Sequence, residues 1–282
     1  MVYDARGDHE AEHAFHVAGR GDARDPRVRP GLARIRRAEA IVCARAARAL
    51  CVSSALRDVL EARHPGTAAR ADVIPCGVDD LRFRPDPAAR AEARRRLGLG
   101  ERFVVCYAGA LGPYHLPEQV VRAGAVARRV RPDAHLLLVT PEVERGRALV
   151  AAAGLGPDAA TVVAAAHDEV PALLNAADVG LLLRRRDPVN AVASPTKLAE
   201  YLACGLPVIV SDGIGDASAL VREGRAGEVL RDVDDPVALE RALRRLMDEA
   251  PSRRAVAVLA RARLARSAFL DVYRRVYAAA LA

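Results

Sequence analysis

The sequence predicts an α/β fold built on a doubly wound parallel sheet. From about residue 100 onward, short apolar runs rich in β-branched residues alternate with stretches of helical periodicity. Uninterrupted apolar runs are typical of parallel strands that helices cover on both faces. The chain has 282 residues, of which 51% are hydrophobic and 28% are charged, so it can bury a core large enough for one or two domains.

The predicted elements of this sheet follow one another in a regular order. The six expected strands are residues 103–109, 135–140, 161–166, 179–183, 207–211 and 227–230. The helical stretches that follow them are residues 117–130, 142–153, 170–177, 194–203, 216–223 and 236–247. In sheets of this kind, ligands bind where the carboxyl ends of the strands lead into helix N-termini. The expected ligand loops are those after Gly109, Ala166, Leu183 and Ser211.

The N-terminal part of the chain predicts a smaller and incomplete unit. Its elements are a loop at 19–31, a helix at 32–48, a strand at 49–53, a helix at 54–64 and a strand at 72–78. Two strands and two helices bury too little surface for a stable domain. We therefore assign residues 1–78 to a partial Rossmann-like domain and residues 79–258 to a complete, doubly wound Rossmann-like C-terminal domain.

The C-terminal stretch, residues 252–282, has the pattern of one long basic amphipathic helix. We expect its last part, residues 259–282, to cross back and pack on the N-terminal unit. Such a pattern also leaves a peripheral contact with the inner membrane face open as an alternative.

Charge and aromatic content argue against a nucleic-acid partner. The formal net charge is +7 and the isoelectric point is near 9.6, but the cations are spread along the whole chain. Only 4% of the residues are aromatic and none is Trp, which leaves little to stack on unpaired bases. We therefore expect no nucleic-acid partner.

The sequence is typical of a cytoplasmic protein. Its longest uncharged stretch, Phe103–Pro117, has 15 residues, fewer than the roughly 18 to 20 of a membrane-spanning helix. The first residues lack the basic and apolar regions of a secretion signal. Five scattered cysteines suit free buried thiols better than disulfides or a zinc site. They are Cys43, Cys51, Cys76, Cys106 and Cys204.

The segment SPTKLAEYLACGLPVIVSD, residues 194–212, carries the main functional signal. Ser194 is a good N-cap, Pro195 suits the first helical position, and Gly205 suits the position after the helix end. A helix N-terminus at a ligand loop stabilises anions, because its N–H groups and its dipole both present positive charge. The Thr196 hydroxyl and the Lys197 ammonium group are both suited to phosphate oxygens.

Lys197 is the single lysine among 43 basic residues, which favours a specific role for it. Glu200 lies one turn deeper and is placed to accept hydrogen bonds from sugar hydroxyls. The alternative is a well-capped helix on which Lys197 and Glu200 are ordinary surface residues.

This segment also carries a resemblance to a known family. Together with HDEVPALLNAADVGLLL at 167–183 and VIPCGVDDLRFRP at 73–85, it resembles the donor-binding half of family 4 glycosyltransferases, which have the GT-B fold. The resemblance extends over residues 37–280, and YDARGDHEAE near the start is similar to a late piece of that family's N-terminal, acceptor-side domain. It implies transfer of a sugar from a nucleotide diphosphate sugar, with retention of configuration and without an obligatory metal or other cofactor. The implied acceptor is a glycan, a lipid-linked molecule or a small molecule.

The resemblance assigns roles to individual residues. The diphosphate would be bound by the residues Gly109, Ser194, Pro195, Thr196 and Lys197. Glu200 would bind the ribose, and the loop residues Ala166, His167 and Val170 would hold the base. Lys197 and His115 would act in catalysis by stabilising negative charge on the leaving group.

The sequence departs from the family pattern at several positions. Val192 stands where many members have the first of two glutamates spaced eight apart. In the loop GALGPYH, Ala110 replaces an arginine and His115 occupies a lysine position, a pattern shared by some relatives with an SPTK helix. The family's N-terminal domain would place further strands before Asp4. We therefore keep open a truncated chain, a split enzyme with a separate N-terminal half, or a non-catalytic nucleotide-sugar binding remnant.

A third functional alternative comes from the motif HEAEH at residues 9–13. Two histidines four residues apart with a glutamate between them match the zinc-binding pattern of metallohydrolases. A zinc hydrolase using His9, Glu10 and His13 would need a third ligand, and the sequence predicts no strand before this segment. The alternative reading is an exposed acidic helical turn.

Overall fold

The computed structural model describes residues 1–281. Its larger sheet contains the six predicted strands, each with ends within three residues of those expected. They are β4 (Val104–Ala108), β5 (His135–Val139), β6 (Ala160–Val163), β7 (Val179–Leu182), β8 (Val208–Ser211) and β9 (Gly227–Leu230). All neighbouring strands are parallel, and the spatial order is β6-β5-β4-β7-β8-β9. The order reverses between β4 and β7, so the loops after these two strands diverge and leave a crevice for a ligand.

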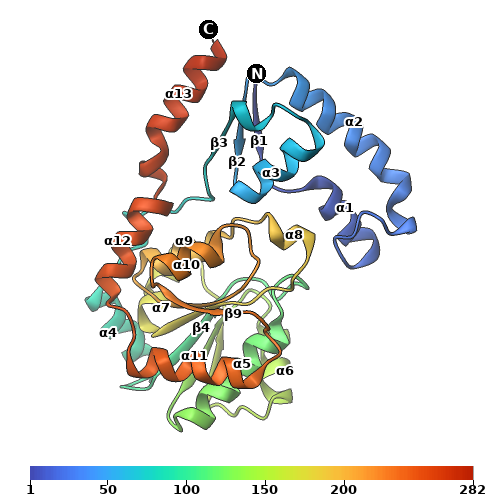
Figure 1. The fold of residues 1–282 in the computed structure, drawn as a ribbon. Coiled ribbons are helices and arrows are strands. Elements are labelled where there is room, and N and C mark those ends of the chain that lie inside the picture. The colour runs from blue at the N-terminus through green and yellow to red at the C-terminus, as the bar shows by residue number, and fades with distance from the viewer. Residues whose placement is uncertain (282) are drawn as a thin grey trace.

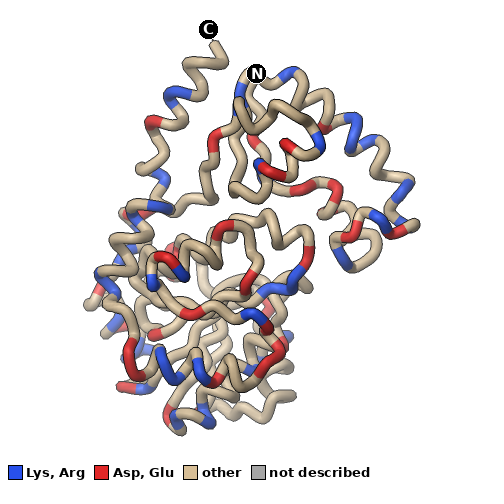
Figure 2. The backbone as a smooth tube through the Cα atoms, viewed as in Figure 1, with Lys and Arg blue, Asp and Glu red and all other residues tan. Residues whose placement is uncertain are grey.

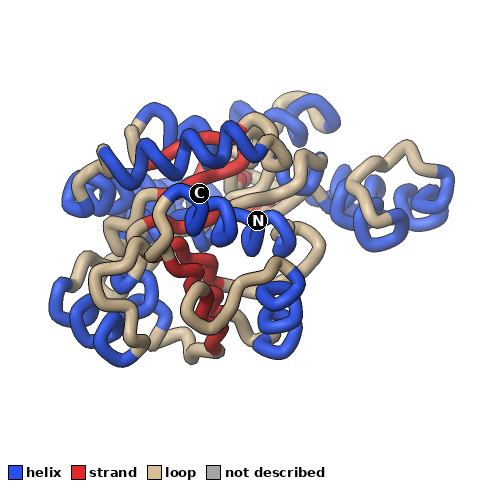
Figure 3. The backbone as a smooth tube through the Cα atoms, turned by 90° about the horizontal axis from the view of Figure 1, so that it is seen from below, coloured by secondary structure: helices blue, strands red, loops and turns tan. Residues whose placement is uncertain are grey.

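Helices cover both faces of this sheet (Figures 1 and 3). The helices of the larger unit are α4 (Pro87–Arg96), α5 (Pro117–Val130), α6 (Val143–Ala152), α7 (Val170–Ala176), α8 (Pro188–Ala191), α9 (Thr196–Ala203), α10 (Ala217–Glu223) and α11 (Pro236–Asp248). Alternate residues of β4 enter two separate apolar clusters. Cys106 packs with α7 and α9, whereas Val105 packs with α5 and α11. The continuous apolar run therefore reflects burial on both faces, as predicted.

The N-terminal unit contains three parallel strands in the order β1-β2-β3. They are β1 (Val2–Ala5), β2 (Arg48–Cys51) and β3 (Ala71–Val73), and the helices are α1 (His9–Ala18), α2 (Arg29–Arg45) and α3 (Ser54–Arg63), with short 3₁₀ turns at Pro26–Val28 and Ala68–Arg70. The expectation of two strands was wrong. The strand β1 is a four-residue edge strand with only Ala5 fully buried, so it carries no apolar run that could predict it.

The C-terminal stretch is two helices and not the single helix expected. Helix α12 (Arg253–Leu264) and helix α13 (Leu270–Leu281) are separated by a 3₁₀ turn at Arg266–Phe269. The break occurs because Ala265 forms a parallel bridge with Val78: the Val78 N–H donates to the Leu264 carbonyl at 2.9 Å, and Val78 accepts from the Arg266 N–H at 3.0 Å.

Helix α13 lies against the small sheet (Figure 1). Its Val276 is fully buried with Leu50 of β2 and Ile74, and Arg275 pairs with Asp72 of β3 at 2.8 Å. The last helix therefore contributes to the core of the first unit.

Polar contacts join the two units around the carboxyl ends of the large sheet. The Gly21 N–H donates to Asp187 at 2.8 Å, and the Ser54 N–H donates to Asp216 at 2.8 Å. The rings of Phe15 on α1 and Tyr114 stack with centroids 4.0 Å apart. The N-terminal unit therefore forms one wall beside the expected ligand loops.

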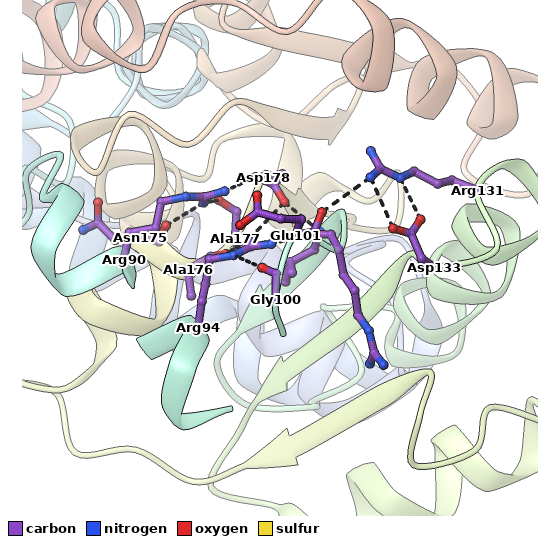
Figure 4. A network of polar contacts seen from close by, with 12 residues as sticks. Arg90, Arg94, Gly100, Glu101, Arg131, Asp133, Asn175, Ala176, Ala177 and Asp178 are labelled. Atoms are coloured by element: carbon purple, nitrogen blue, oxygen red, sulfur yellow. Dashed lines mark hydrogen bonds and ion pairs between the residues drawn. The ribbon is translucent and has the colours of Figure 1, made fainter. Parts of the chain in front are cut away.

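A network of arginines holds the opposite, amino edge of the sheet (Figure 4). Arg94, which is 8% exposed, donates to three backbone carbonyl oxygens, those of Gly100, Arg102 and Ala176. Arg90 pairs with Asp178 at 2.6 Å, and Asp178 accepts from the backbone N–H of Val104 at 2.8 Å. These bonds fix α4 and the end of α7 to the start of β4.

Basic and acidic residues are interspersed along the backbone (Figure 2). Many of them form ion pairs with each other. The five cysteines are free thiols, as expected. Within residues 1–281, no helix combines the length and the apolar character that crossing a bilayer requires.

Candidate functional site at the start of helix α9

Helix α9 begins where the chain returns from β7 to the crevice. Pro195 is its N-cap residue, and no side chain of residues 1–281 caps the helix. The expected capping role of Ser194 was wrong, because its Oγ accepts a hydrogen bond from the Cys76 N–H of the N-terminal unit at 2.9 Å. The first turn of α9, which includes the exposed Thr196, therefore presents uncapped backbone to the ligand side.

Tyr201 fixes α9 across the sheet. Its side chain is fully buried, and its hydroxyl accepts from the Ala108 N–H at 2.7 Å, at the end of β4. Its ring lies against Gly180 of β7, where any Cβ would overlap with it. The helix is therefore held on the two strands that flank the crevice.

Lys197 is brought to the end of β4 by this packing. Its Nζ donates to the Tyr107 hydroxyl at 2.7 Å and lies 4.3 Å from the centre of the Tyr107 ring. Gly109 has a φ of 137°, and a Cβ there would overlap with the end of the Lys197 side chain. Burial and the neighbouring charge of Arg184 lower the pKa of Lys197 to about 7, with Glu200 opposing the shift.

Arg184 is a member of the site that the sequence analysis did not single out. It is the first residue after the β7 run, and its Nη1 donates to the Asn190 Oδ1 at 3.2 Å. The signal for it was present, because the loop after Leu183 was one of the four expected ligand loops. Burial lowers the pKa of its guanidinium.

His115 lies beside these two cations. Burial, followed by the charges of Lys197 and Arg184, lowers the pKa of His115 to about 3. At neutral pH the side chain is therefore a neutral imidazole, which can donate an N–H hydrogen bond but adds no positive charge.

The residues expected to bind ribose and base come from α9 and from the loop that leads into α7. Glu200 is half-buried on α9, and burial raises the pKa of its carboxyl while the charge of His167 opposes this rise. His167 is exposed, and its ring centroid lies 5.6 Å from that of Phe83. The Ala166 N–H donates to Glu169 at 2.9 Å, and Val170 begins α7. The expected base loop therefore lies near Glu200.

A cavity of about 420 Å³ opens between the two units in front of α9. From the larger unit it is lined by Tyr114, His115, Arg184, Val189, Asn190, Ala193, Ser194, Pro195 and Thr196, and from the N-terminal unit by Arg6, Gly7, Glu12 and His16. Gly109 and Lys197, which are also expected to bind the diphosphate, are not part of this lining.

The HEAEH segment does not form a metal site. It lies on α1 directly after β1, so the expectation that no strand precedes it was wrong. Glu10 is buried and accepts two hydrogen bonds from Arg36, at 2.9 and 2.8 Å, and the His13 Nε2 lies 3.2 Å from the Val28 carbonyl oxygen. No group of three or more metal-binding side chains is found in residues 1–281. The structure therefore gives the zinc hydrolase alternative no support.

Two protein-family models match this chain. Residues 89–263, more than half of the chain, match the model of the glycosyl transferases group 1, and residues 10–82 match that of glycosyltransferase family 4. The chain belongs to the glycosyl transferases group 1. Its fold is accordingly the GT-B fold implied by the resemblance of the sequence.

Curated relatives of this group 1 chain agree with the family match. It is 34% identical over 215 residues to D-inositol 3-phosphate glycosyltransferase of Salinispora tropica, covering 71% of this chain and 42% of the relative. It is 36% identical over 175 residues to a GDP-mannose-dependent alpha-(1-6)-phosphatidylinositol monomannoside mannosyltransferase of Mycobacterium tuberculosis, covering 60% of this chain and 45% of the relative. The chain spans slightly less than half the length of these relatives.

Solved structures resemble this group 1 chain over most of its length. The Anabaena protein Alr3699/HepE, crystallised with UDP and glucose, superposes with a TM-score of 0.75 and 18% identity, covering 98% of this chain and 71% of that one. WaaG, a glycosyltransferase involved in lipopolysaccharide biosynthesis, gives a TM-score of 0.62 and 20% identity, covering 83% and 61%.

Proposed function

We propose that this chain binds a nucleotide diphosphate sugar with residues 79–258 and transfers the sugar to an acceptor with retention of configuration. The observation that carries the proposal is the position of Lys197. It is the single lysine of the chain, it lies at the uncapped start of α9 against Gly109, and it has no carboxylate partner in residues 1–281. A basic group held at a helix N-terminus and at the carboxyl end of a parallel sheet is suited to phosphate.

Each predicted site residue has a role in this proposal. The diphosphate lies along Gly109 and the turn of Ser194, Pro195 and Thr196, with Lys197 as its charged partner. Glu200 accepts from the ribose hydroxyls, and the loop of Ala166, His167 and Val170 holds the base. Because Ser194 already bonds to Cys76 through its hydroxyl, we expect the backbone of this turn to contact the phosphate.

The proposed reaction breaks the bond between the anomeric carbon and the diphosphate oxygen. Both electrons leave with the diphosphate, while the acceptor oxygen bonds to the anomeric carbon on the same face and its proton passes to the leaving group. Lys197, the helix dipole and the neutral His115 N–H stabilise the charge that develops on the diphosphate. We propose no obligatory metal, since these groups supply the stabilisation.

The names of relatives support a donor of this class. One relative is named for GDP-mannose, and a structural neighbour was crystallised with UDP and glucose. The acceptor, a glycan, a lipid-linked molecule or a small molecule, would enter through the cavity between the two units.

Isothermal titration calorimetry of the full chain with UDP, GDP and ADP tests the proposal. We expect one nucleotide to bind, Lys197→Met to lose that binding, and Lys197→Arg to retain part of it because the charge is kept. Glu200→Gln should lower the affinity for the nucleotide but not the affinity for pyrophosphate. The sugar conjugate of the nucleotide that binds is then incubated with D-inositol 3-phosphate as the first acceptor, and NMR identifies the product anomer. Binding without transfer to any acceptor would identify a non-catalytic binding protein, and no nucleotide binding would refute the proposal.

A further inference from the structure

Arg184 is held rigidly at the edge of the crevice. Its backbone N–H donates to the Ser211 Oγ at 2.7 Å, which ties the end of β7 to the end of β8. Its guanidinium donates to Asn190, whose own side chain is fully buried and donates to the Arg185 carbonyl at 2.9 Å. The position of the guanidinium is therefore set by neutral groups.

The charge of Arg184 is not balanced by the protein. Its Nε atom is buried without a hydrogen-bond partner, and within residues 1–281 no carboxylate forms an ion pair with it. It also lies close enough to Lys197 and His115 to lower the pKa of both. A partly buried cation that lies beside the Lys197 ammonium group and has no counter-ion destabilises the fold.

The loop after β4 supplies no further cation that could bind an anion in the crevice. It reads GALGPYH, and the only basic side chain in it, His115, is neutral at neutral pH. From the loops at the carboxyl ends of the large sheet, positive charge therefore comes from Lys197 on α9 and Arg184 after β7. Arg6 of the N-terminal unit also faces the cavity, but its guanidinium is paired with Asp4 at 2.7 Å. Arg184 also lines the cavity between the units.

We propose that Arg184 is a second cationic ligand of the diphosphate, which binds between its guanidinium and the Lys197 ammonium group and supplies the missing negative charge. Asn190 is a positioning residue that orients the guanidinium. This inference rests on the proposed function, because it assumes that the anion in the crevice is a diphosphate. Asn190 engages only the Nη1 atom of the guanidinium, and Arg184 lines the cavity, so its outer N–H groups can donate to the ligand. A planar guanidinium can pair two oxygens at once.

The test compares Arg184→Met with Arg185→Met, which removes an equal charge from an exposed position of the same loop. Pyrophosphate is the probe, since it carries neither base nor sugar, and calorimetry measures its affinity. We expect Arg184→Met to lower the affinity for pyrophosphate at least tenfold and Arg185→Met to change this affinity less than twofold. Without ligand, Arg184→Met should melt at or above the wild-type temperature, because it removes an unbalanced charge. A purely structural arginine would give a lower melting temperature.

A second variant provides a test that keeps Arg184 in place. Asn190→Asp puts a carboxylate beside the guanidinium, so it should neutralise the charge of Arg184 and lower the affinity for pyrophosphate. Equal pyrophosphate affinity of wild type, Arg184→Met and Asn190→Asp would overturn the role of Arg184 while leaving the proposed function intact. If the wild type bound neither pyrophosphate nor any nucleoside diphosphate, the proposed function would fail and this inference with it.

Discussion

The ammonium group of Lys197 lies 2.7 Å from the hydroxyl oxygen of Tyr107, which is its hydrogen-bond acceptor. The same hydroxyl donates to the Ala110 carbonyl oxygen, so Tyr107 joins the start of α9 to the loop after β4. A phosphate oxygen would offer Lys197 a charged partner in place of this neutral one. Charged partners form the stronger hydrogen bonds, so we expect Lys197 to exchange Tyr107 for the ligand.

Nucleotide affinity should depend on pH through Lys197. Burial and Arg184 lower the pKa of Lys197 to about 7, so the free side chain loses its proton as the pH rises through that value. A bound diphosphate favours the protonated form, so binding above pH 7 takes up a proton. The affinity for UDP, or for whichever nucleotide binds, should then fall by up to about tenfold per pH unit between pH 7 and 9.

Calorimetry in buffers of different ionisation enthalpy measures this proton uptake directly. Lys197→Arg provides the control, because it is expected to keep part of the binding and its guanidinium stays protonated up to pH 9, so it takes up no proton at this position. A wild-type affinity that stays constant up to pH 9 would contradict a titrating Lys197.

Substitution of Gly109 should impair the site through Lys197. In Gly109→Ala, the added Cβ would overlap with the end of the Lys197 side chain, and the φ of 137° strains any non-glycine residue. We expect nucleotide affinity to fall about tenfold, equivalent to about 1.4 kcal/mol. Gly112→Ala in the same loop is the matched control, because its Cβ would meet no atom within 4 Å. Equal losses of affinity in both variants would point to loop flexibility and not to Lys197.

Arg94 should matter for stability but not for ligand binding. Arg94→Met leaves three carbonyl oxygens without their guanidinium donor at the amino edge of the sheet, far from α9. The free energy of unfolding should fall by about 3 kcal/mol. Chemical denaturation measures this loss, and calorimetry should find nucleotide affinity unchanged.

Arg95→Met is the matched control for Arg94→Met. Arg95 is exposed on the same helix and pairs only with Glu92, so its loss should cost less than about 1 kcal/mol. If both variants lost the same stability, the buried network would have no special role.

The main sheet was predictable because its strands are continuous apolar runs. Neighbouring residues such as Val105 and Cys106 face opposite clusters, so every residue of β4 is apolar and is buried on one face of the sheet or the other. Helix α5 was predicted with its observed bounds, since Pro117 marks its start and its apolar residues recur at helical spacing. Sequence patterns therefore predicted those strands and helices whose formation depends on residues close to one another in the chain.

Features that depend on distant residues were not predictable in this way. The break between α12 and α13 arises from Val78, which is remote in sequence from Ala265. Ser194 loses its expected capping role because Cys76 competes for its hydroxyl. Arg184 is one of three consecutive arginines, and only the folded chain distinguishes the one that is half-buried beside Asn190 from its two exposed neighbours.

The position of α13 has a consequence for the order of synthesis. Leu50 and Ile74 leave the ribosome about 200 residues before Val276, which packs with them in one buried cluster. Domains generally fold as units during translation, and N-terminal ones generally fold first. Here the large sheet has all its strands before α13 is made, while the small sheet still exposes apolar surface. The small sheet is therefore translated before the large one but completed after it, and until then it exposes apolar surface that a chaperone would have to protect.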